Sequence, residues 1–374
     1  MRALLAFILL LAAVGAGAQP AVAPPAIAAK AYLLLDYHSR QTLASERAEE
    51  RFEPASLTKL MTAYLTFGAL RDKKITADQV VPVSERAWKA EGSRMFIEPR
   101  KPVTVDELIR GMIVQSGNDA CIALAELIAG SEEQFAQLMN KEAQRLGMKN
   151  TNFMNATGLP NAQHYSTAQD LALLAAAIIH DFPQYHPLYS LKEYRYNNIT
   201  QPNRNRLLWA DPSVDGMKTG YTENAGYCLI TSARRGERRL VSVVLGTASE
   251  SARATESQKL INWGFQFFDS VKLYDANAAV ASLPVWKGAA NSVRAGFADA
   301  LYVSVPKGQA DKLKAQLQSR QPLLAPLAAG QTIGVLKLTL DGKPYAEFPA
   351  LALDAVPQAG LIGRGWDSLR LLFK

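Results

Sequence analysis

A serine and a lysine stand three positions apart at the start of an apolar segment with helical periodicity. Ser56 and Lys59 belong to the stretch Pro54-Ala-Ser-Leu-Thr-Lys59, and residues three apart in a helix share one face. A serine hydroxyl is a weak nucleophile that needs a base within hydrogen-bond reach, and a desolvated lysine with a lowered pKa can act as that base. The pair therefore indicates acyl transfer through Ser56, although Ser-x-x-Lys alone also occurs in ordinary solvent-facing helices.

Ser116 and Asn118 form a second candidate segment. They follow a predicted helix, at a break marked by Gly117. A hydroxyl and an amide are therefore expected to stand together on a short loop, where they can relay a proton and orient a peptide carbonyl.

The triplet Lys218-Thr219-Gly220 lies directly before a predicted pair of strands. The lysine and the threonine can hold a carboxylate, and the glycine lets a substrate backbone approach the sheet edge. Alone, the Ser116 segment and this triplet are each compatible with a loop or a turn. The occurrence of all three segments together, in this order, is much harder to obtain by chance.

The remaining periodicity predicts the elements that must position these segments. Strands are predicted at residues 31–36, 41–45, 228–233 and 240–246, helices between about 54 and 185, and a further helix at 252–268. Capping-box pairs mark helix starts at Thr104, Ser131 and Thr167. This order predicts an α+β fold in which helices pack on an antiparallel sheet.

The pattern changes near residue 273. Short alternating runs such as 301–305 and 332–340 predict a small β-rich domain at 273–357, after a larger domain at 19–272. The tail, 358–374, carries apolar residues at helical spacing together with three cations: Ile362, Trp366, Leu369 and Phe373, with Arg364, Arg370 and Lys374. It is predicted to be an amphipathic segment in a membrane interface, and a helix docked on the second domain is the alternative.

Residues 1–18 have the features of a cleaved secretory signal. Arg2 precedes an apolar run over residues 3–14, and Ala16-Gly17-Ala18 offers a small-residue cleavage site. The run is well short of the roughly 20 residues that a membrane span needs. Export is therefore expected, and residues 19–29, rich in proline and alanine, are predicted to be a flexible start of the mature protein.

The composition narrows the possible partners. Of the 374 residues 48% are hydrophobic, enough for one large core or two unequal ones, and the formal charge is +7. The basic residues form no run with interleaved aromatics, which argues against nucleic acid, and the mild excess suits an anionic cell-wall polymer or lipid surface. Cys121 and Cys228 are predicted to be buried thiols. No cofactor is expected, because no metal-ligand spacing, phosphate loop or dinucleotide motif occurs.

Together the three motifs resemble the set found in class A β-lactamases and penicillin-binding proteins. The chain looks like the low-molecular-mass penicillin-binding proteins of the D,D-carboxypeptidase type (peptidase family S11-like), and residues 214–220 and 263–268 also resemble that family. The resemblance implies a serine D-alanyl-D-alanine carboxypeptidase that removes the terminal D-alanine from peptidoglycan stem pentapeptides in cell wall biogenesis and is inhibited by β-lactams. It also implies a transpeptidase-like domain, a small β spacer domain and a C-terminal helix on the periplasmic side of the inner membrane.

The resemblance further implies catalytic roles for particular residues. Ser56 would attack the carbonyl of the penultimate D-alanine, and Lys59 would take its proton. The backbone N–H groups of Ser56 and Tyr221 would hold the oxyanion. Ser116, linked to Lys218, would pass a proton to the departing D-alanine.

The resemblance also implies which residues bind the substrate. Asn118 would orient the peptide, while Thr219 and Arg253 would bind the terminal carboxylate together with the lysine of the triplet and Gly220 beside it. For Arg253 a surface helix arginine is the alternative. Known relatives have histidine where this chain has Tyr221, so a backbone role survives but a side-chain effect on the pH profile does not transfer.

Sequence features argue against three other functions. D,D-endopeptidases of the same superfamily usually lack a second domain, so residues 273–374 argue against them. A class A β-lactamase depends on a loop glutamate for deacylation, and no clear Glu-x-x-Leu-Asn pattern lies between Ser116 and Lys218. A catalytically silent wall-binding scaffold is disfavoured by the intact motifs, and Ser56→Ala would separate the two cases.

Overall fold

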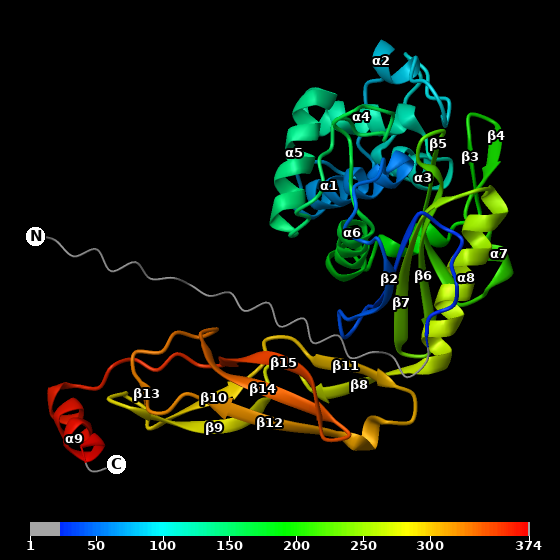
Figure 1. Cartoon of the computed structure of the whole chain (residues 1–374). Helices are drawn as coiled ribbons and strands as arrows, with labels where there is room; N and C mark the ends of the chain where they lie inside the picture. Colours follow the sequence, from blue (N-terminus) through cyan, green and yellow to red (C-terminus); the bar gives the residue numbers. More distant parts are fainter. Residues whose placement is uncertain (1–22, 373–374) are drawn as a thin grey trace, which may run out of the picture. The chain divides into compact units, whose positions relative to one another are not determined.

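The computed structural model describes residues 23–372, which fall into two compact units (Figure 1). One unit is Ala23–Ser270, and Val271 begins the other. The predicted signal at 1–18 and the last two residues of the predicted tail helix, Phe373 and Lys374, lie outside the described residues.

The first unit is built on a five-stranded antiparallel sheet in the order β2-β1-β7-β6-β5. Its strands are β1 (Ala31–Asp36), β2 (Thr42–Glu46), β5 (Val214–Thr222), β6 (Gly226–Arg235) and β7 (Arg238–Thr247). All six residues of β1 are buried, because this strand lies between two others and has a core on each face. A continuous apolar run is the sequence pattern of such a strand.

Helices cover both faces of this sheet. One face carries α1 (Lys59–Arg71), α2 (Glu85–Trp88), α3 (Val105–Val114), α4 (Asn118–Ala129), α5 (Glu132–Arg145) and α6 (Ala168–Asp181). The other face carries α8 (Glu250–Phe267), which packs on β6 and β7 (Figure 1). Smaller elements complete the unit: η1 (Ala55–Thr58), η2 (His186–Ser190), β3 (Glu193–Tyr196), β4 (Ile199–Pro202) and α7 (Leu207–Ala210).

Two hydrophobic cores lie on the two faces of the sheet, as the alternation of side chains along a strand requires. Leu33 and Val243 belong to the larger core under the helical group. Their chain neighbours Leu34 and Val244 belong to the smaller core beneath α8. The predicted α+β fold class is confirmed.

The helix starts predicted at Thr104, Ser131 and Thr167 are confirmed. Thr104 and Glu107 form a complete capping box at the start of α3. Ser131 and Thr167 each accept a hydrogen bond from the backbone N–H three residues later. These side chains satisfy N–H groups that have no partner inside the helix.

The prediction of a flexible segment up to residue 29 is wrong for the part that the structure describes. The carbonyl of Ala23 accepts a hydrogen bond from Trp263 Nε1 at 3.1 Å, and the N–H of Ala28 donates to Glu256 Oε2 at 3.1 Å. Ile27 joins the core beneath α8. One apolar side chain and two hydrogen bonds to α8 thus order a segment whose composition alone suggested a linker.

The second unit is made mainly of strands. Six of them form a sheet in the order β12-β14-β15-β10-β9-β13, and β11 pairs with β8. The elements are β8 (Phe268–Tyr274), β9 (Ala279–Trp286), β10 (Ser292–Gly296), β11 (Leu301–Pro306), η3 (Ala310–Lys312), β12 (Leu313–Ser319), β13 (Leu323–Leu324), β14 (Thr332–Leu340), β15 (Lys343–Ala352) and α9 (Leu361–Leu371). Its small core falls into two clusters, one around Val293 and one around Val303.

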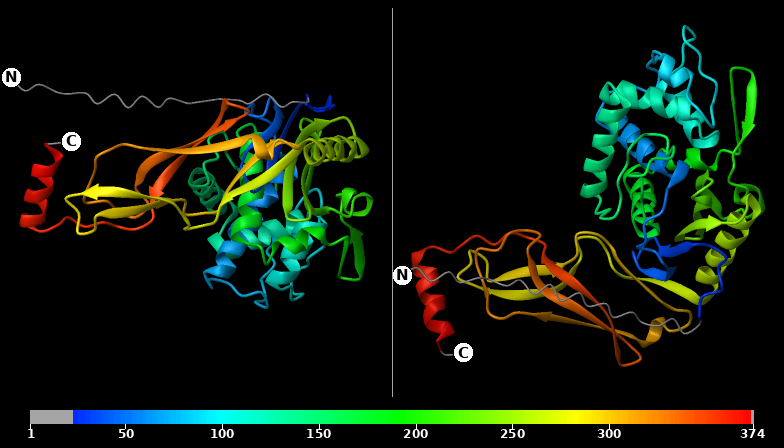
Figure 2. Two further views of the ribbon diagram at one scale, coloured as in Figure 1. Left: turned by 90° about the horizontal axis from the view of Figure 1, so that it is seen from below. Right: turned by 45° about the horizontal axis from the view of Figure 1, so that its top comes forward.

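The tail forms the predicted helix, α9, which lies at one end of this unit (Figure 2). Asp367 Oδ2 accepts a hydrogen bond from the N–H of Lys287 at 2.6 Å, and the guanidinium of Arg370 lies 5.7 Å from the ring centroid of Trp286. Among residues 23–372, no helix is both long enough and apolar enough to cross a bilayer.

Candidate active site

Ser56 lies on η1, a single 3₁₀ turn that leads directly into α1 at Lys59. The sequence predicted an α-helix here, and the tighter turn is a difference. Residues three apart nearly eclipse each other in a 3₁₀ turn, so the two side chains still meet: Lys59 Nζ lies 2.9 Å from Ser56 Oγ.

The amine of Lys59 is buried among oxygen atoms. Besides Ser56 Oγ, its Nζ contacts Asn118 Oδ1 at 2.7 Å and the carbonyl of Thr157 at 2.6 Å. Burial, together with the nearby positive charge of Arg204, lowers the pKa of Lys59 to about 8. About a tenth of the amine is therefore neutral at pH 7, and this fraction, which can act as a general base, grows as the pH rises.

Ser116 lies on the three-residue connection between α3 and α4 and has a positive φ of 59°. Its Oγ lies 2.9 Å from Lys218 Nζ, which also donates to the carbonyl of Thr219 at 2.9 Å. Burial and the charge of Lys59 hold the pKa of Lys218 well below its ordinary value. A second serine and lysine thus form a pair beside the first.

Asn118, the first residue of α4, has both ends of its amide engaged. Its Oδ1 accepts from Lys59, and its Nδ2 donates to the carbonyl of Glu91 at 2.6 Å. The backbone N–H of Asn118 donates to the carbonyl of Ser93 at 2.6 Å. In this structure the side chain fixes the lysine, a task that the sequence did not suggest.

Lys218, Thr219, Gly220 and Tyr221 all lie in β5, the outermost strand of the sheet. The triplet precedes the predicted strand pair, which is β6 and β7, but it lies itself in a strand that the sequence did not predict. Gly216 and Gly220 interrupt the β-type pattern, because glycine has no side chain to pack and is disfavoured in strands.

The structure gives a different reason for the glycine at position 220 from the one that the sequence suggested. A Cβ at this position would lie 3.1 Å from the carbonyl oxygen of Pro54 and 3.4 Å from the Cβ of Ala55. The glycine therefore lets the strand approach the turn that carries Ser56, where the sequence had suggested close approach of a substrate.

Arg253, in the first turns of α8, is 5% exposed. Its guanidinium donates to the carbonyls of Gly220 and Arg204, at 3.5 and 3.3 Å, and to Glu250 Oε1 at 3.2 Å. Burial lowers the pKa of Arg253. This arginine is thus part of the site's wall next to β5 and does not project from the surface.

Arg204 is a residue that sequence reasoning missed. It lines a hollow of about 600 Å³ together with Trp209 and Glu250, and its positive charge lowers the pKa of both Lys59 and Lys218. It belongs to no motif, since it stands in the connection between β4 and α7. Only the folded chain brings it to the two lysines.

Tyr221, near the end of β5, is half exposed. Its ring lies 4.4 Å, centroid to centroid, from the ring of Tyr227 on β6, directly across the strand pair. Such cross-strand aromatic pairs stabilise a sheet. The aromatic side chain therefore has a packing role of its own at the rim of the site.

The two cysteines are free and buried, as predicted. His164 is buried as well, with Nε2 2.9 Å from Thr58 Oγ1, and burial followed by the charge of Lys59 lowers its pKa to about 4. It is therefore neutral at physiological pH and links its loop to the turn that carries Ser56.

The fold and this arrangement define a class of protein. A serine lies against a buried lysine with a lowered pKa, a second serine–lysine pair lies next to it, and an edge strand of the sheet runs alongside. These are the parts of an active-serine acyltransferase of the penicillin-recognising kind.

Comparison with known proteins identifies the family. The model described as D-alanyl-D-alanine carboxypeptidase matches residues 18–249, and the model of the penicillin-binding protein 5 C-terminal domain matches 268–358. The D-alanyl-D-alanine carboxypeptidase DacC of Escherichia coli (strain K12) is 43% identical over 376 residues, covering 98% of this chain and 94% of that protein. The chain belongs to the D-alanyl-D-alanine carboxypeptidase family and is a serine hydrolase of that type.

Solved structures agree with this. Penicillin binding protein 5 from Haemophilus influenzae has a TM-score of 0.86 and 42% identity, and the match covers 90% of this chain and all of that one. Penicillin-binding protein D2 from Listeria monocytogenes, solved in an ampicillin-bound form, has a TM-score of 0.61 and 29% identity over 65% of this chain and 100% of its own. The predicted family and enzyme class are confirmed.

Proposed function

We propose that this enzyme removes the terminal D-alanine from peptidoglycan stem pentapeptides through an acyl-enzyme on Ser56. The observation that carries the proposal is the 2.9 Å contact between Ser56 Oγ and Lys59 Nζ, with the pKa of the lysine lowered to about 8. A base must both reach the proton and be free to accept it, and this pair meets the two requirements.

In the acylation step Ser56 Oγ attacks the carbonyl carbon of the penultimate D-alanine while Lys59 takes the hydroxyl proton. The oxyanion is held by the backbone N–H groups of Ser56 and Tyr221, on the 3₁₀ turn and on the edge strand. As the peptide C–N bond breaks, the departing amine receives a proton from Ser116, which Lys218 supports from 2.9 Å. Water then hydrolyses the ester and restores the serine.

The terminal carboxylate of the substrate is proposed to bind between β5 and α8. Thr219 supplies a hydroxyl, and Arg253 and Lys218 supply positive charge. Burial lowers the pKa of Arg253 and of Arg204, which means that these cations lack full solvation. A bound carboxylate would compensate the positive charges of these cations. Asn118 and Gly220 are proposed to lie at the borders of the same cleft.

β-Lactams are proposed to acylate the same serine. Opening the ring leaves the amine tethered to the acyl group, so no fragment departs and the adduct persists. No cofactor takes part in this scheme, because a serine, a lysine and backbone N–H groups suffice for acyl transfer.

Export and membrane contact are part of the proposal. Five apolar residues of the tail are at least half exposed: Leu361, Ile362, Trp366, Leu369 and Leu372. Arg364 and Arg370 stand among them. Such a helix can lie in the headgroup region of an anionic bilayer, which would hold the enzyme on the periplasmic side of the inner membrane, with residues 273–357 as a spacer and 19–272 as the catalytic domain.

Mass spectrometry tests the central proposal. The purified protein is incubated with a penicillin and, separately, with a diacetyl-Lys-D-Ala-D-Ala tripeptide, and Ser56→Ala is treated in parallel. We expect an adduct on the peptide that contains Ser56, release of D-alanine, and neither signal from the variant. An adduct without D-alanine release would point to an endopeptidase, and the absence of both signals from the unaltered protein would overturn the proposal.

A further inference from the structure

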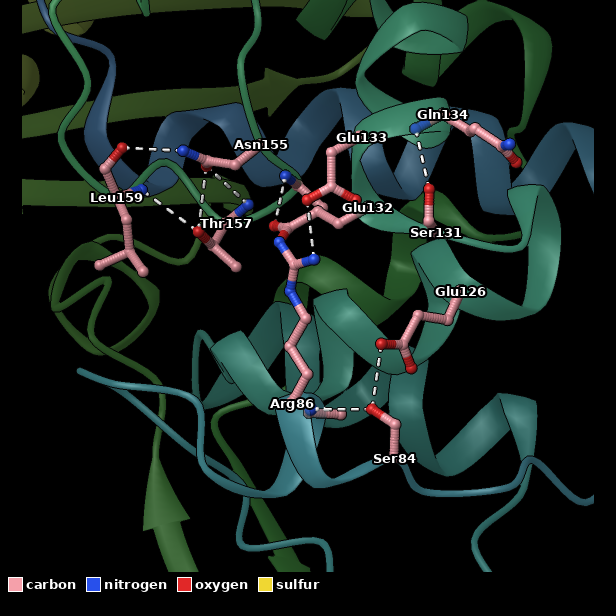
Figure 3. A network of polar contacts seen from close by, with 12 residues as sticks. Ser84, Arg86, Glu126, Ser131, Glu132, Glu133, Gln134, Asn155, Thr157 and Leu159 are labelled. Carbon is pink, nitrogen blue, oxygen red and sulfur yellow. Dashed lines mark hydrogen bonds and ion pairs between the residues drawn. The ribbon is translucent and has the colours of Figure 1, made fainter.

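An ion-paired group of side chains contacts the loop that contains Asn155 and Thr157 (Figure 3). Arg86, from α2, contacts two carboxylates in the first turn of α5: its Nη2 lies 2.6 Å from Glu132 Oε2 and its Nη1 lies 2.8 Å from Glu133 Oε1. Glu132 is 5% exposed, whereas the side chain of Glu133 is 65% exposed. The other oxygen of Glu132 accepts the N–H of Ala156 at 3.0 Å.

Ala156 belongs to a loop that is closed by its own side chains. Asn155 Oδ1 accepts from the N–H groups of Thr157 and Gly158, at 3.2 and 2.7 Å, and from the hydroxyl of Thr157 at 3.0 Å (Figure 3). The carbonyl of Ala156 accepts from Thr62 Oγ1, on α1, at 2.7 Å. The loop is therefore fixed from two sides, by Glu132 on α5 and by α1.

The same loop touches both groups that begin the reaction. The carbonyl of Thr157 accepts from Lys59 Nζ at 2.6 Å. Gly158 has a φ of +86°, and a Cβ there would lie 1.8 Å from the carbonyl oxygen of Ala55 and 3.0 Å from the N of Ser56. Small shifts of this loop would therefore change the position of the lysine and of the turn that carries the serine.

The contacts of the lysine amine give the loop a chemical role. A neutral amine has two N–H bonds and one lone pair. If the two N–H bonds point to Asn118 Oδ1 and the Thr157 carbonyl, the lone pair is left for the hydroxyl proton of Ser56. Loss of either acceptor would let the amine rotate, and the lone pair would spend less time in line with that proton.

We propose that the Arg86–Glu132 ion pair positions Lys59 for acylation, by holding the loop 155–158 so that the carbonyl of Thr157 orients the amine toward Ser56. The inference rests on the proposed roles of Ser56 and Lys59. Glu132 is a positioning residue, because it acts on the amine through Ala156 and Thr157.

Charge offers a way to separate this role from simple support of the fold. Several ionisable groups act on Lys59: Lys218, Arg204, His164, Asp119, Cys121 and Glu132. The carboxylates of Asp119 and Glu132 raise the pKa of the lysine against the effect of burial. Removing the charge of Glu132 will therefore lower that pKa further, while loss of its ion pair with Arg86, which holds the loop 155–158, will lower the maximal rate.

The experiment measures the rate of acylation by a penicillin from pH 6 to 10, using the full chain. Glu132→Gln keeps an oxygen that can accept from the N–H of Ala156 but loses the charge and the ion pair. We expect the rising, acidic limb of its pH–rate profile to move down by roughly half a pH unit. The plateau rate at high pH should fall about tenfold. Arg86→Gln should lower the plateau without the downward shift. Glu133→Gln, which also loses a contact with Arg86 but none with the loop, should stay within about twofold of the unaltered enzyme.

The outcomes are distinguishable. If the unaltered enzyme forms no adduct on Ser56, the proposed function fails, and the inference fails with it. If the unaltered enzyme is acylated but Glu132→Gln matches it in both limb and plateau, only the inference is wrong. Circular dichroism and thermal unfolding give the folded fraction of each variant; a plateau that falls only in proportion to that fraction, with no shift of the limb, would also overturn the positioning role.

Discussion

Lys59 Nζ lies 2.9 Å from Ser56 Oγ, and the lysine is 1% exposed. The side chains proposed as base and nucleophile therefore touch in the resting enzyme, where the lysine is shielded from bulk water and the serine is partly exposed. Burial provides the lowered pKa, and the neighbouring oxygens provide the orientation. Both properties lead to measurable consequences.

The acylation rate should rise with pH through a midpoint of about 8. Lys59 must be neutral to accept the serine proton, and burial places its pKa at about 8, so the reactive fraction grows as pH increases from 6 to 9. Stopped-flow measurement with a fluorescent penicillin will give the profile. Lys59→Met should lower the rate by about 10²–10⁴-fold and remove this limb; a limb that persists in the variant would assign the base to another group.

Ser116→Ala should lower the release of D-alanine by about 10²-fold or more, because the departing amine loses its proton donor. The distance of 2.9 Å between Ser116 Oγ and Lys218 Nζ makes the hydroxyl the group that the lysine supports. Turnover of the tripeptide gives kcat and KM separately. We expect kcat to fall and KM to change little; the reverse pattern would indicate a binding role.

Gly158→Ala should unfold far more easily than Gly147→Ala. Both glycines have a positive φ, of 86° and 78°, but a Cβ at Gly158 would meet the backbone of Ala55 at 1.8 Å, whereas nothing lies within 4 Å of a Cβ at Gly147. Backbone strain alone costs about 1–3 kcal/mol, so urea unfolding should show about that loss for Gly147→Ala. A clearly larger loss is expected for Gly158→Ala, and equal losses would contradict the close approach.

Arg253→Gln should raise KM for a peptide with a free C-terminal carboxylate by about 10–100-fold, the range for loss of a charged hydrogen bond. The same substrate with an amidated C-terminus binds weakly to both proteins and should show little difference between them. Arg234→Gln, at an exposed position near the end of β6, is the control. Equal effects of Arg253→Gln on the acid and the amide would rule out carboxylate recognition by this residue.

Ile362→Ser combined with Trp366→Ser should abolish binding to vesicles that contain anionic lipid. Both side chains are largely exposed on α9, and apolar burial together with positive charge is what holds such a helix at an interface. Co-sedimentation at low and at high salt will measure the binding. Leu324→Ser, which removes an exposed apolar side chain elsewhere in the same unit, should bind normally, and undiminished binding by the double variant would exclude α9 as the contact.

Much of the sheet could be predicted because its strands have strong local patterns. β1 is a run of six buried residues and β7 a run of buried valine and leucine, so their apolar content reveals them. The strand β5 was missed because Gly216 and Gly220 weaken its pattern and because it pairs on one side only. Its partner, β6, is what makes this segment a strand, and pairing between strands is a tertiary property.

The candidate site likewise contains some residues that the sequence could predict and others that it could not. Ser56, Lys59, Ser116 and Lys218 could be found because each lies in a short motif with a fixed spacing. Arg204 could not, because a single arginine in a connection gives no periodic or spacing signal. The link from Glu132 to Lys59 passes through a loop more than twenty residues away in the chain, and only the folded structure brings those groups together.

The burial of the two cysteines has a consequence for the chemistry of sulfur in this enzyme. Burial raises the pKa of Cys121 to about 12 and that of Cys228 to about 11. The thiolate is the form that oxidants and disulfide-exchange enzymes attack, and its population at neutral pH is negligible in both. In the oxidising compartment proposed for it, the two thiols of the folded enzyme are therefore inert toward oxidation and disulfide exchange, and pairing of Cys121 with Cys228 is confined to the interval before the core has closed.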